Sequence, residues 1–205
     1  MKKMLKGYFT HSTIIGLWVL FFACLVVCIS TGLLQHYYLW LILPIIIAPF
    51  YEWYAHKFIL HAQLPIKDGL LRRMMIRLHH GHHREPQNYE LLFAPVWAVV
   101  IHLIQTYILF AIITWSFTIA LVPFTSGVLY YLWYEWVHLG HHTPEYQSLT
   151  PVGKKLKRAH MWHHYYNENY YWGITNYFGD KCLGTFKEKS ELEKSVTTKN
   201  IAGYQ

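Results

Sequence analysis

The sequence predicts an all-α membrane protein with four transmembrane helices. Apolar residues make up 54% of the 205 positions and charged residues only 14%, a composition typical of membrane proteins rather than soluble domains. A helix that crosses the bilayer needs about 20 consecutive, mostly apolar residues. Four stretches of the chain meet this requirement. The length fits one domain, which we expect to cover residues 1–186, followed by a polar tail at 187–205 without a chemical role.

The first two spans are predicted at residues 13–34 and 37–55. The first contains no charged residue. The second contains Pro44 and Pro49, which we expect to bend it, and a single acid, Glu52, near its end. Because only two residues separate these spans, they are expected to form a tight helical hairpin.

The third and fourth spans are predicted at residues 94–114 and 117–137. Trp115 and Ser116 form the short link between them, so these spans are expected to form a second hairpin. The fourth span again carries a single acid, Glu135, near its end. Mid-span in the third lies a histidine, His102, for which we expect a hydrogen bond to another helix.

The basic residues predict the orientation in the membrane. All 18 precede the first span, lie between the second and third spans (Lys67 among them), or follow the fourth, and the two short links contain none. By the positive-inside rule, both termini and the middle loop are cytoplasmic. The net charge of +7 is therefore a topology signal. No nucleic-acid-binding motif accompanies it.

Histidine is concentrated in four short clusters that follow or flank the spans on the side predicted to be cytoplasmic. Ten of the 15 histidines belong to them: His56 and His61; His79, His82 and His83; His138 and His142; His160, His163 and His164. Neutral imidazole is the commonest side-chain metal ligand, and ten imidazoles cannot surround one ion. The clusters therefore predict a two-metal centre. The cysteines lack zinc-finger spacing, so histidine is expected to bind the metals.

Helical spacing predicts how the clusters are presented. Residues three or four apart share a helix face, so three of the clusters are expected to project together. His56 and His61 are five apart and would diverge by about 140° on a regular helix. This pair needs a helix end or a bend, or its members bind different ions.

Glu52 and Glu135 precede the first and third clusters by about one turn. A carboxylate near the membrane is costly and is usually functional. We expect each to accept the second ring N–H of a metal-binding imidazole, in preference to direct metal ligation. Pairing with Lys57 or an arginine is the alternative.

Five blocks of sequence resemble the fatty acid hydroxylase superfamily of membrane di-metal oxygenases: Glu52–His61, Leu78–Arg84, Tyr134–His142, His160–Tyr166 and Trp172–Thr185. The resemblance covers residues 37–186 and is greatest to the fatty acid 2-hydroxylases. It implies four transmembrane helices, a cytosolic helical cap and two metal ions shared among the clustered histidines. The third cluster departs from the family pattern at His141, so either His141 or His142 can be its second ligand, and His141 is a possible additional ligand. Trp162, Tyr165 and Tyr166 are expected on the substrate access path.

The resemblance also implies the activity. The chain is expected to be a di-iron monooxygenase that hydroxylates the acyl chain of a fatty acid or lipid, at the carbon next to the carboxyl, with dioxygen as co-substrate. A sample purified in air could carry zinc in place of iron. Without a fused haem domain, electrons would come from a separate cytochrome b5-like protein or a ferredoxin with its reductase. A bacterial inner membrane is favoured over the endoplasmic reticulum.

Other functions are compatible with parts of the pattern. A sterol desaturase or carotenoid hydroxylase would use the same di-iron site. A metal transporter would place its ligands near the bilayer midplane, whereas these clusters lie at one face. A structural lipid-binding protein would tolerate loss of individual histidines.

Overall fold

The computed structural model describes residues 2–64 and 69–201, and these residues form helices and loops without any strand. The predicted all-α class is therefore confirmed. Lys67 and the last four positions of the predicted tail lie outside the described residues. Within them, four helical segments are long and apolar enough to cross a membrane: Ser12–Ser30, Leu33–Leu60, Tyr89–Thr114 and Phe117–His142. The chain is a multi-pass membrane protein.

The first hairpin turns earlier than predicted. Helix α1 (Lys2–Thr10) leads into α2 (Ser12–Ser30), and α3 (Leu33–Tyr37) begins after a two-residue turn. Gly32 in that turn has φ of +72°, a conformation that glycine adopts at little cost. The backbone therefore reverses there, and the residues predicted as the link, 35–36, belong to α3.

The second span changes its helical geometry along its length. A 3-10 segment, η1 (Tyr38–Ile42), precedes α4 (Leu43–Tyr54), and a π-helical turn, η2 (Ala55–Leu60), follows it. Pro44 occupies the first turn of α4, where a missing backbone N–H costs little, and Pro49 lies inside the helix. The helix type therefore changes just before Pro44, the first of the two positions at which the sequence predicts a bend.

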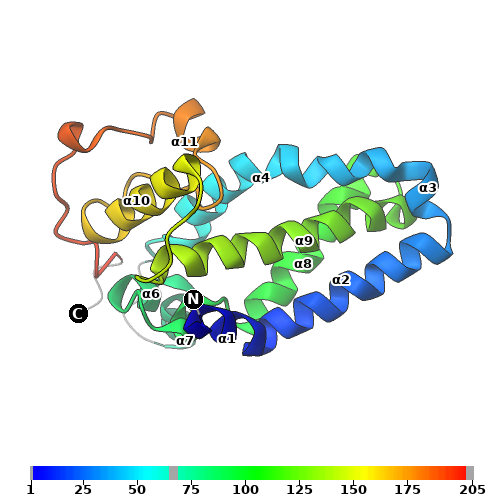
Figure 1. The fold of residues 1–205 in the computed structure, drawn as a ribbon, viewed down its shortest axis with the longest axis horizontal. Coiled ribbons are helices and arrows are strands. Elements are labelled where there is room, and N and C mark those ends of the chain that lie inside the picture. The colour runs from blue at the N-terminus through cyan, green and yellow to red at the C-terminus, as the bar shows by residue number, and fades with distance from the viewer. Residues whose placement is uncertain (1, 65–68, 202–205) are drawn as a thin grey trace.

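The second hairpin agrees with the prediction. Helix α8 (Val96–Thr114) and helix α9 (Phe117–His142) are joined by Trp115 and Ser116, and the Ser116 hydroxyl accepts the backbone N–H of Ile119. Helix α9 continues five residues past the predicted span. It lies between α2 and α4 and also contacts α8, so it forms the centre of the bundle (Figure 1).

The predicted interhelical hydrogen bond of His102 is confirmed, since its Nδ1 lies 2.8 Å from the Tyr51 hydroxyl of α4. Large apolar side chains on the outside of the bundle are exposed, among them Val19 and Ile112. Such a surface suits contact with lipid.

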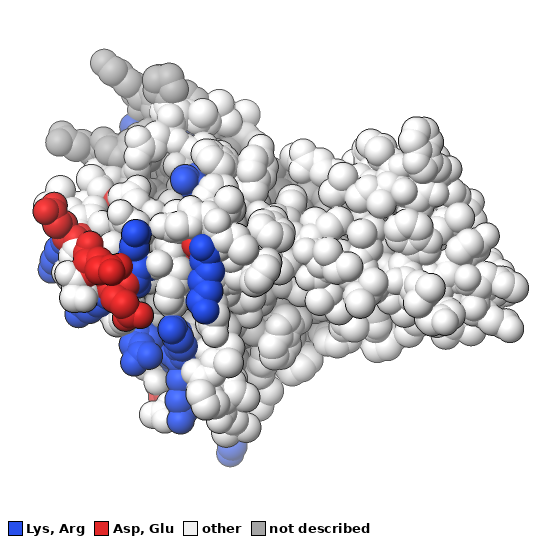
Figure 2. All heavy atoms as spheres, turned by 90° about the horizontal axis from the view of Figure 1, so that it is seen from above, with Lys and Arg blue, Asp and Glu red and all other residues white. Residues whose placement is uncertain are grey.

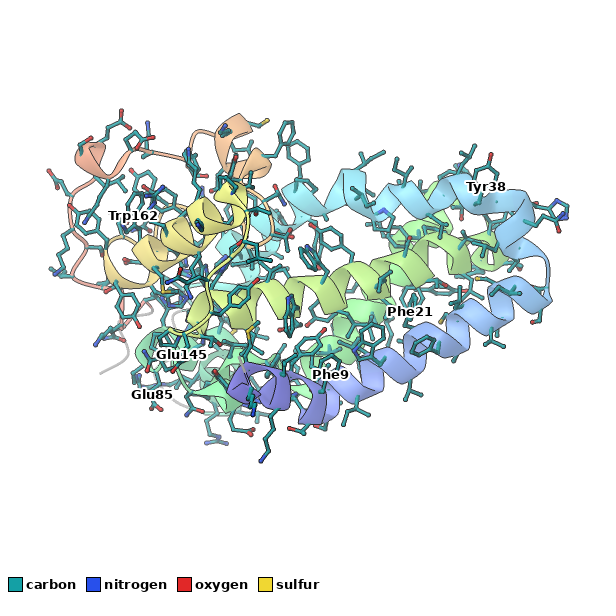
Figure 3. All side chains as sticks on the ribbon, in the orientation of Figure 1. Phe9, Phe21, Tyr38, Glu85, Glu145 and Trp162 are labelled. Carbon is teal, nitrogen blue, oxygen red and sulfur yellow. The ribbon has the colours of Figure 1, made fainter. Side chains whose placement is uncertain are left out.

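The remaining helices form a cap over one end of the bundle (Figure 1). They are α5 (Leu70–Met75), the π-helical turn η3 (Ile76–His80), α6 (Gly81–Arg84), α7 (Tyr89–Leu92), α10 (Pro151–Tyr165), α11 (Phe178–Cys182) and the 3-10 turn η4 (Lys189–Glu191). Charged side chains gather on the cap and are absent from the visible face of the bundle (Figure 2). In Figure 3, Glu85, Glu145 and Trp162 lie in the cap, whereas Phe21 and Tyr38 lie along the bundle.

A half-buried lysine attaches the cap to the central helix. The Lys157 ammonium of α10 donates to the carbonyls of Gly140, Thr143 and Tyr146, at 3.1, 2.6 and 2.6 Å. The carbonyls at the end of a helix have no partners within it and attract a cation. Helix α10 is thereby held beside the end of α9, where two histidine clusters meet.

Candidate metal centre

The structure brings all ten predicted histidines together, in two groups of five. The first group consists of His56, His61, His79, His83 and His163; the second group consists of His82, His138, His142, His160 and His164. Within each group, one ring nitrogen from each residue lies within 4.8 Å of the others. Nearly all of these side chains are buried, so the ring nitrogens face each other rather than solvent.

Two of the clusters divide between the groups. His79 and His83 belong to the first group, while His82, which lies between them in the sequence, belongs to the second. The cluster on α10 divides in the same way, with the four-apart pair in the second group and His163 in the first. At 100° per residue, positions four apart differ by about 40°, whereas His82 points about 100° away from its neighbour. The clusters therefore do not project as units. His82 belongs to the second group and His163 to the first, whereas the other histidines of each of these two clusters belong to the opposite group.

The π-helical turn η2 explains how His56 and His61 reach the same group. The backbone N–H of His61 donates to the carbonyl of His56 at 3.0 Å, so residues five apart lie one turn apart. The two rings therefore lie on one helix face, with centroids 5.0 Å apart. Of the alternatives that the spacing leaves open, the structure has a helix end, formed by this π-helical turn, and both imidazoles face the same site.

Backbone carbonyls determine the tautomers of three rings in the first group. The Nδ1 atoms of His56 and His163 lie 2.7 Å from the carbonyls of Trp172 and Tyr170. The Nδ1 atom of His83 lies 3.0 Å from the carbonyl of Thr198. A carbonyl only accepts, so each Nδ1 carries the proton and each Nε2 has a free lone pair. Burial keeps these rings neutral; it lowers the pKa of His83 to about 3.

The Nε2 atoms of the first group, three of which carry these free lone pairs, face one another at short range. The Nε2 of His56 lies 3.1 Å from that of His79, and the Nε2 of His61 lies 3.0 Å from that of His83 and 3.2 Å from that of His163. Converging lone pairs repel each other unless a cation lies between them. An all-nitrogen donor set of this kind suits a transition metal, and the residues of the first group therefore fit a metal ion.

The Nε2 atoms of the second group also converge, but fewer hydrogen bonds from the surrounding chain hold its rings. The Nε2 of His142 lies 3.1 Å from that of His82 and 2.8 Å from that of His160. In the described part of the chain, the buried Nδ1 atoms of His82, His160 and His164 have no hydrogen-bond partner. This group also fits a metal ion, but packing alone orients these three rings.

His141 lies outside both groups. Its Nε2 lies 3.0 Å from the Ile174 carbonyl, whereas the neighbouring His142 belongs to the second group. The geometry thus favours His142 over His141 as a metal ligand.

Glu52 has a different partner from the one expected. Its carboxylate accepts the backbone N–H groups of Ile174 and Thr175, each at 3.0 Å, and the hydroxyls of Thr175 and Tyr130 at 2.5 and 2.8 Å. None of these donors is an imidazole. Glu52 and His56 lie four apart on one face of the span, and both meet the same loop, 170–175. Glu52 therefore holds the loop whose carbonyl at Trp172 orients His56.

Asp180 holds the neighbouring part of that loop and was not among the expected site residues. It accepts the N–H groups of Trp172 and Gly173 at 2.9 and 2.7 Å, and the Thr185 hydroxyl at 2.6 Å. Gly173 is required there, because a Cβ would lie 1.9 Å from the Asn176 carbonyl. The only sequence signal for this role is an acid within the Trp172–Thr185 block.

The polar tail also contributes to the site, although the sequence predicted no role for it. Besides the Thr198 carbonyl that accepts from His83, the Ile201 carbonyl accepts the Gln63 side chain at 2.9 Å. Buried Glu168 accepts the hydroxyl of Ser195 at 3.0 Å and that of Thr197. Residues 195–201, which we call the C-terminal strap, therefore lie against His83 of the first group.

A cavity of about 660 Å³ lies between α4, α8 and α9 and reaches both groups. Its cap end is lined by His56 and His79 of the first group and His138 of the second, and its deep end by Pro44 and Phe110. Glu135 also lines it, with one buried carboxylate oxygen unpartnered among the described residues. The expected imidazole partner is not formed at that oxygen, which is buried beside the cavity.

The three aromatic residues expected on the substrate access path do not line this cavity. Trp162 lies on the outer side of α10 and packs against Tyr171, with ring centroids 5.7 Å apart. Tyr165 is exposed, and the Tyr166 hydroxyl donates to the Leu192 carbonyl at 3.0 Å. The cavity wall comes instead from tyrosines of the spans, including Tyr51, Tyr130 and Tyr134.

Comparisons with known proteins give a consistent result. Residues 41–185 match the family model described as fatty acid hydroxylase. The chain is 27% identical over 170 residues to the ceramide very long chain fatty acid hydroxylase SCS7 of Saccharomyces cerevisiae, covering 80% of this chain and 38% of that protein. It is 32% identical over 146 residues to the dihydroceramide fatty acyl 2-hydroxylase FAH1 of Arabidopsis thaliana, covering 70% of this chain and 59% of that protein.

The chain thus spans less than two thirds of the length of the curated relatives it matches. Among solved structures it is similar to full-length Scs7p, of which only the hydroxylase domain is visible, with a TM-score of 0.72 and 25% identity. That match covers 87% of this chain and 69% of the other. The relatives come from yeast and a plant, and they give no support to the expected bacterial inner membrane.

Proposed function

Because this chain belongs to the fatty acid hydroxylase family, we propose that it is a membrane-bound monooxygenase that hydroxylates the acyl chain of a fatty acid or lipid. The carbon next to the carboxyl is the proposed position, since two of its relatives are named fatty acyl 2-hydroxylases. The observation that carries the proposal is the cavity, which extends from the membrane-spanning helices to histidines of both groups.

The cavity gives an acyl chain a place to bind. Its volume lies within the range of about 300–1,000 Å³ that ligand sites occupy. Apolar residues of α4, α8 and α9 line its deep part, where a hydrocarbon tail replaces water. A methylene held at the cap end lies beside His56, His79 and His138, and this positioning is the contribution of the protein.

The two groups are the proposed sites of two iron ions. When bound, iron supplies the activation of dioxygen that an unactivated C–H bond requires. The first group holds one ion with rings whose tautomers the carbonyls of Tyr170, Trp172 and Thr198 determine. The second group holds the other. The cap covers both and excludes water from them.

Reconstitution tests this function. The purified protein is loaded anaerobically with Fe(II), reduced chemically, given acyl lipids and exposed to oxygen, and the lipids are analysed by mass spectrometry. We expect one added oxygen atom at the carbon next to the carboxyl, and no product from His82→Ala. Loss of two hydrogens would indicate a desaturase instead. Unchanged lipids from an enzyme that holds two irons would contradict the proposal.

We further propose that the cap lies in the cytoplasm, as the basic residues predict. Cys182 is exposed in the cap, whereas Cys24 and Cys28 are buried in the bundle. A membrane-impermeant thiol reagent should label Cys182 only from the cytoplasmic side, with Cys182→Ala as the control. Labelling of sealed cells from outside would reverse the orientation.

A further inference from the structure

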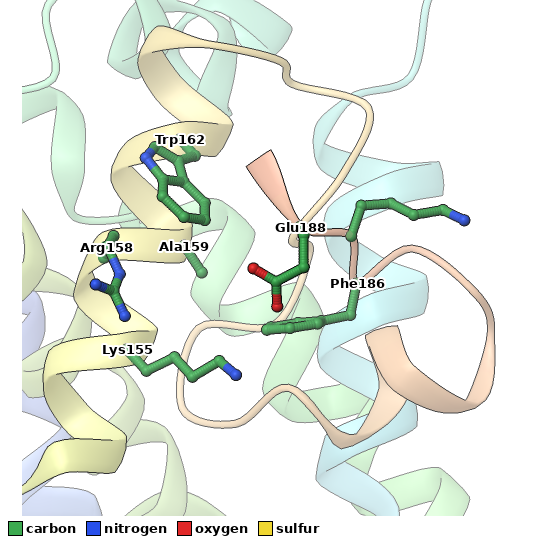
Figure 4. A pocket seen from close by; sticks show the side chains of 7 residues that line it. Lys155, Arg158, Ala159, Trp162, Phe186 and Glu188 are labelled. Carbon is green, nitrogen blue, oxygen red and sulfur yellow. The ribbon is translucent and has the colours of Figure 1, made fainter. Parts of the chain in front are cut away.

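A second, smaller pocket lies on the outer side of the cap. It has a volume of about 180 Å³ and lies between α10 and the segment that follows α11 (Figure 4). Lys155 and Arg158 extend from one wall, with Trp162 on the same helix, while Phe186 and Glu188 face them. Lys187 also lines the pocket, and Lys181 and Lys189 lie near Lys187 in the sequence. We call this the basic pocket.

The cations around the basic pocket lie over aromatic rings. The Lys155 ammonium is 4.8 Å from the centre of the Phe186 ring, and the Arg158 guanidinium is 5.7 Å from that of Trp162. Lys189 is 5.0 Å from the Tyr166 ring. Within the described residues, none of these three cations forms an ion pair, so their charge remains available to a negatively charged partner.

Aromatic rings connect the basic pocket to the first histidine group. Trp162 is followed in the chain by His163, and its ring contacts Tyr171 at 5.7 Å between centroids. Tyr171 is followed by Trp172, whose ring lies 4.7 Å from His61 and 5.2 Å from His163. Trp172 is buried. The outer surface of α10 is thus joined to the metal-binding side by a short series of rings.

The proposed reaction requires electrons from outside the chain. Inserting one oxygen atom of dioxygen into a C–H bond and reducing the other to water consumes two electrons and two protons. The side chains of this chain supply no such electrons. A one-electron carrier protein, with a haem or an iron–sulfur centre, must therefore dock twice per turnover. Transfer rates fall steeply with distance, so the docking surface has to lie near the metals.

The geometry points to the basic pocket as the docking site of an acidic one-electron carrier protein, with electrons passing through Trp162, Tyr171 and Trp172 to the first group. This inference rests on the proposed monooxygenase function. Charge complementarity steers such encounters and sets their rates. Glu188 at the edge of the pocket repels an anionic lipid surface, whereas a protein with mixed charge at its rim can accommodate it.

A charge reversal tests the docking. Lys155→Glu with Arg158→Glu is compared with Lys2→Glu and Lys6→Glu, which change the net charge equally on α1, a helix that packs against α2 and α9. Turnover is measured with the acidic soluble domain of cytochrome b5 as donor, reduced by NADH and its reductase. We expect the apparent KM for the donor to rise about tenfold or more in the α10 variant only, and its salt dependence to weaken.

A second pair of variants tests the electron path. Trp162→Phe keeps a ring beside Tyr171 and Trp162→Leu removes it. The Leu variant should transfer electrons from pre-bound donor several-fold more slowly with an unchanged KM, and the Phe variant should retain the rate. A purely structural role of Trp162 would instead lower the metal content, which is measured in both variants.

The outcomes separate the docking inference from the proposed function. An α10 variant with the same KM as the α1 variant overturns the docking site, and weaker binding to phosphatidylserine vesicles with unchanged KM would assign the pocket to lipid instead. Equal transfer rates in the two Trp162 variants overturn the path. If the chemically reduced wild-type enzyme hydroxylates nothing in a single turnover, the proposed function fails, whatever the docking result.

Discussion

The two histidine groups have similar ligands and different support. In the first group, three rings are held from behind by backbone carbonyls of the C-terminal third of the chain. In the second group, the corresponding nitrogens of three rings have no partner among the described residues. A carbonyl behind a ligand fixes its tautomer and raises its basicity, and losing such a partner costs about 10–100-fold in metal affinity. One site therefore depends on loops and the other on helix packing.

Loss of a metal ligand should have the largest effect, and it would test whether the histidines form two separate metal sites. His163→Ala should lose the metal of the first group, and His160→Ala that of the second, although the two residues are neighbours on α10. Each variant should bind about one metal per chain and lose more than about 100-fold in hydroxylation. Metal analysis and product assays check this.

Exposed His36 at the far end of the bundle serves as the control for that experiment. Its alanine variant should bind two metals and remain active. Loss of both metals in either ligand variant would show that the groups do not fill independently.

Removal of the C-terminal strap should have the second largest effect, and it should weaken metal binding in the first group only. A chain that ends at Glu193 lacks the Thr198 carbonyl that orients His83. We expect the metal affinity of the first group to fall by about 10–100-fold and that of the second to stay the same. Metal titration of the purified variant measures both. A second site that is also lost would contradict separate support for the two groups.

Asp180→Asn should have a smaller effect, because the loop keeps its other contacts. Asparagine retains the shape but replaces one acceptor by a donor, which then faces a backbone N–H. We expect about tenfold weaker metal binding in the first group, and about 1–3 kcal/mol lower unfolding free energy.

Glu52→Gln provides the comparison for Asp180→Asn. Glu52 holds the loop at Ile174, whose carbonyl accepts from His141 rather than from a histidine of either group. It should therefore weaken the first site less than Asp180→Asn does. Equal loss of metal in both variants would mean that the loop orients the rings as one rigid body.

The smallest effect is expected at His141. His141→Gln replaces the ring N–H by an amide N–H that can still donate to the Ile174 carbonyl, so the unfolding free energy should change by less than about 1 kcal/mol while two metals remain bound. His142→Ala should instead lose the metal of the second group. Thermal unfolding and metal analysis of the two variants decide whether His141 or His142 is the metal ligand. A metal deficit in His141→Gln would reassign the ligand.

Much of this protein follows from its local sequence. The spans and the second hairpin were predictable because a bilayer crossing requires a fixed length of apolar helix, which a sequence displays directly. The ten histidines were predictable as a set because so many imidazoles beside one membrane face are hard to explain otherwise. The ends of the spans were less predictable, since α9 continues into the cap, where packing rather than lipid determines its length.

The sequence alone determined which side chains are available for metal, and the tertiary structure decided how they are shared. Positions three and four apart look equivalent in a pattern, but they differ from the first position by about 60° and about 40° in opposite directions around the helix. Only the packing of α9 against α10 and the cap assigns each direction to a group. The carbonyls behind the rings could not be predicted either. Every residue has a carbonyl, so its use at Tyr170, Trp172 and Thr198 leaves no mark in the residue type and arises only when the chain folds back over the site.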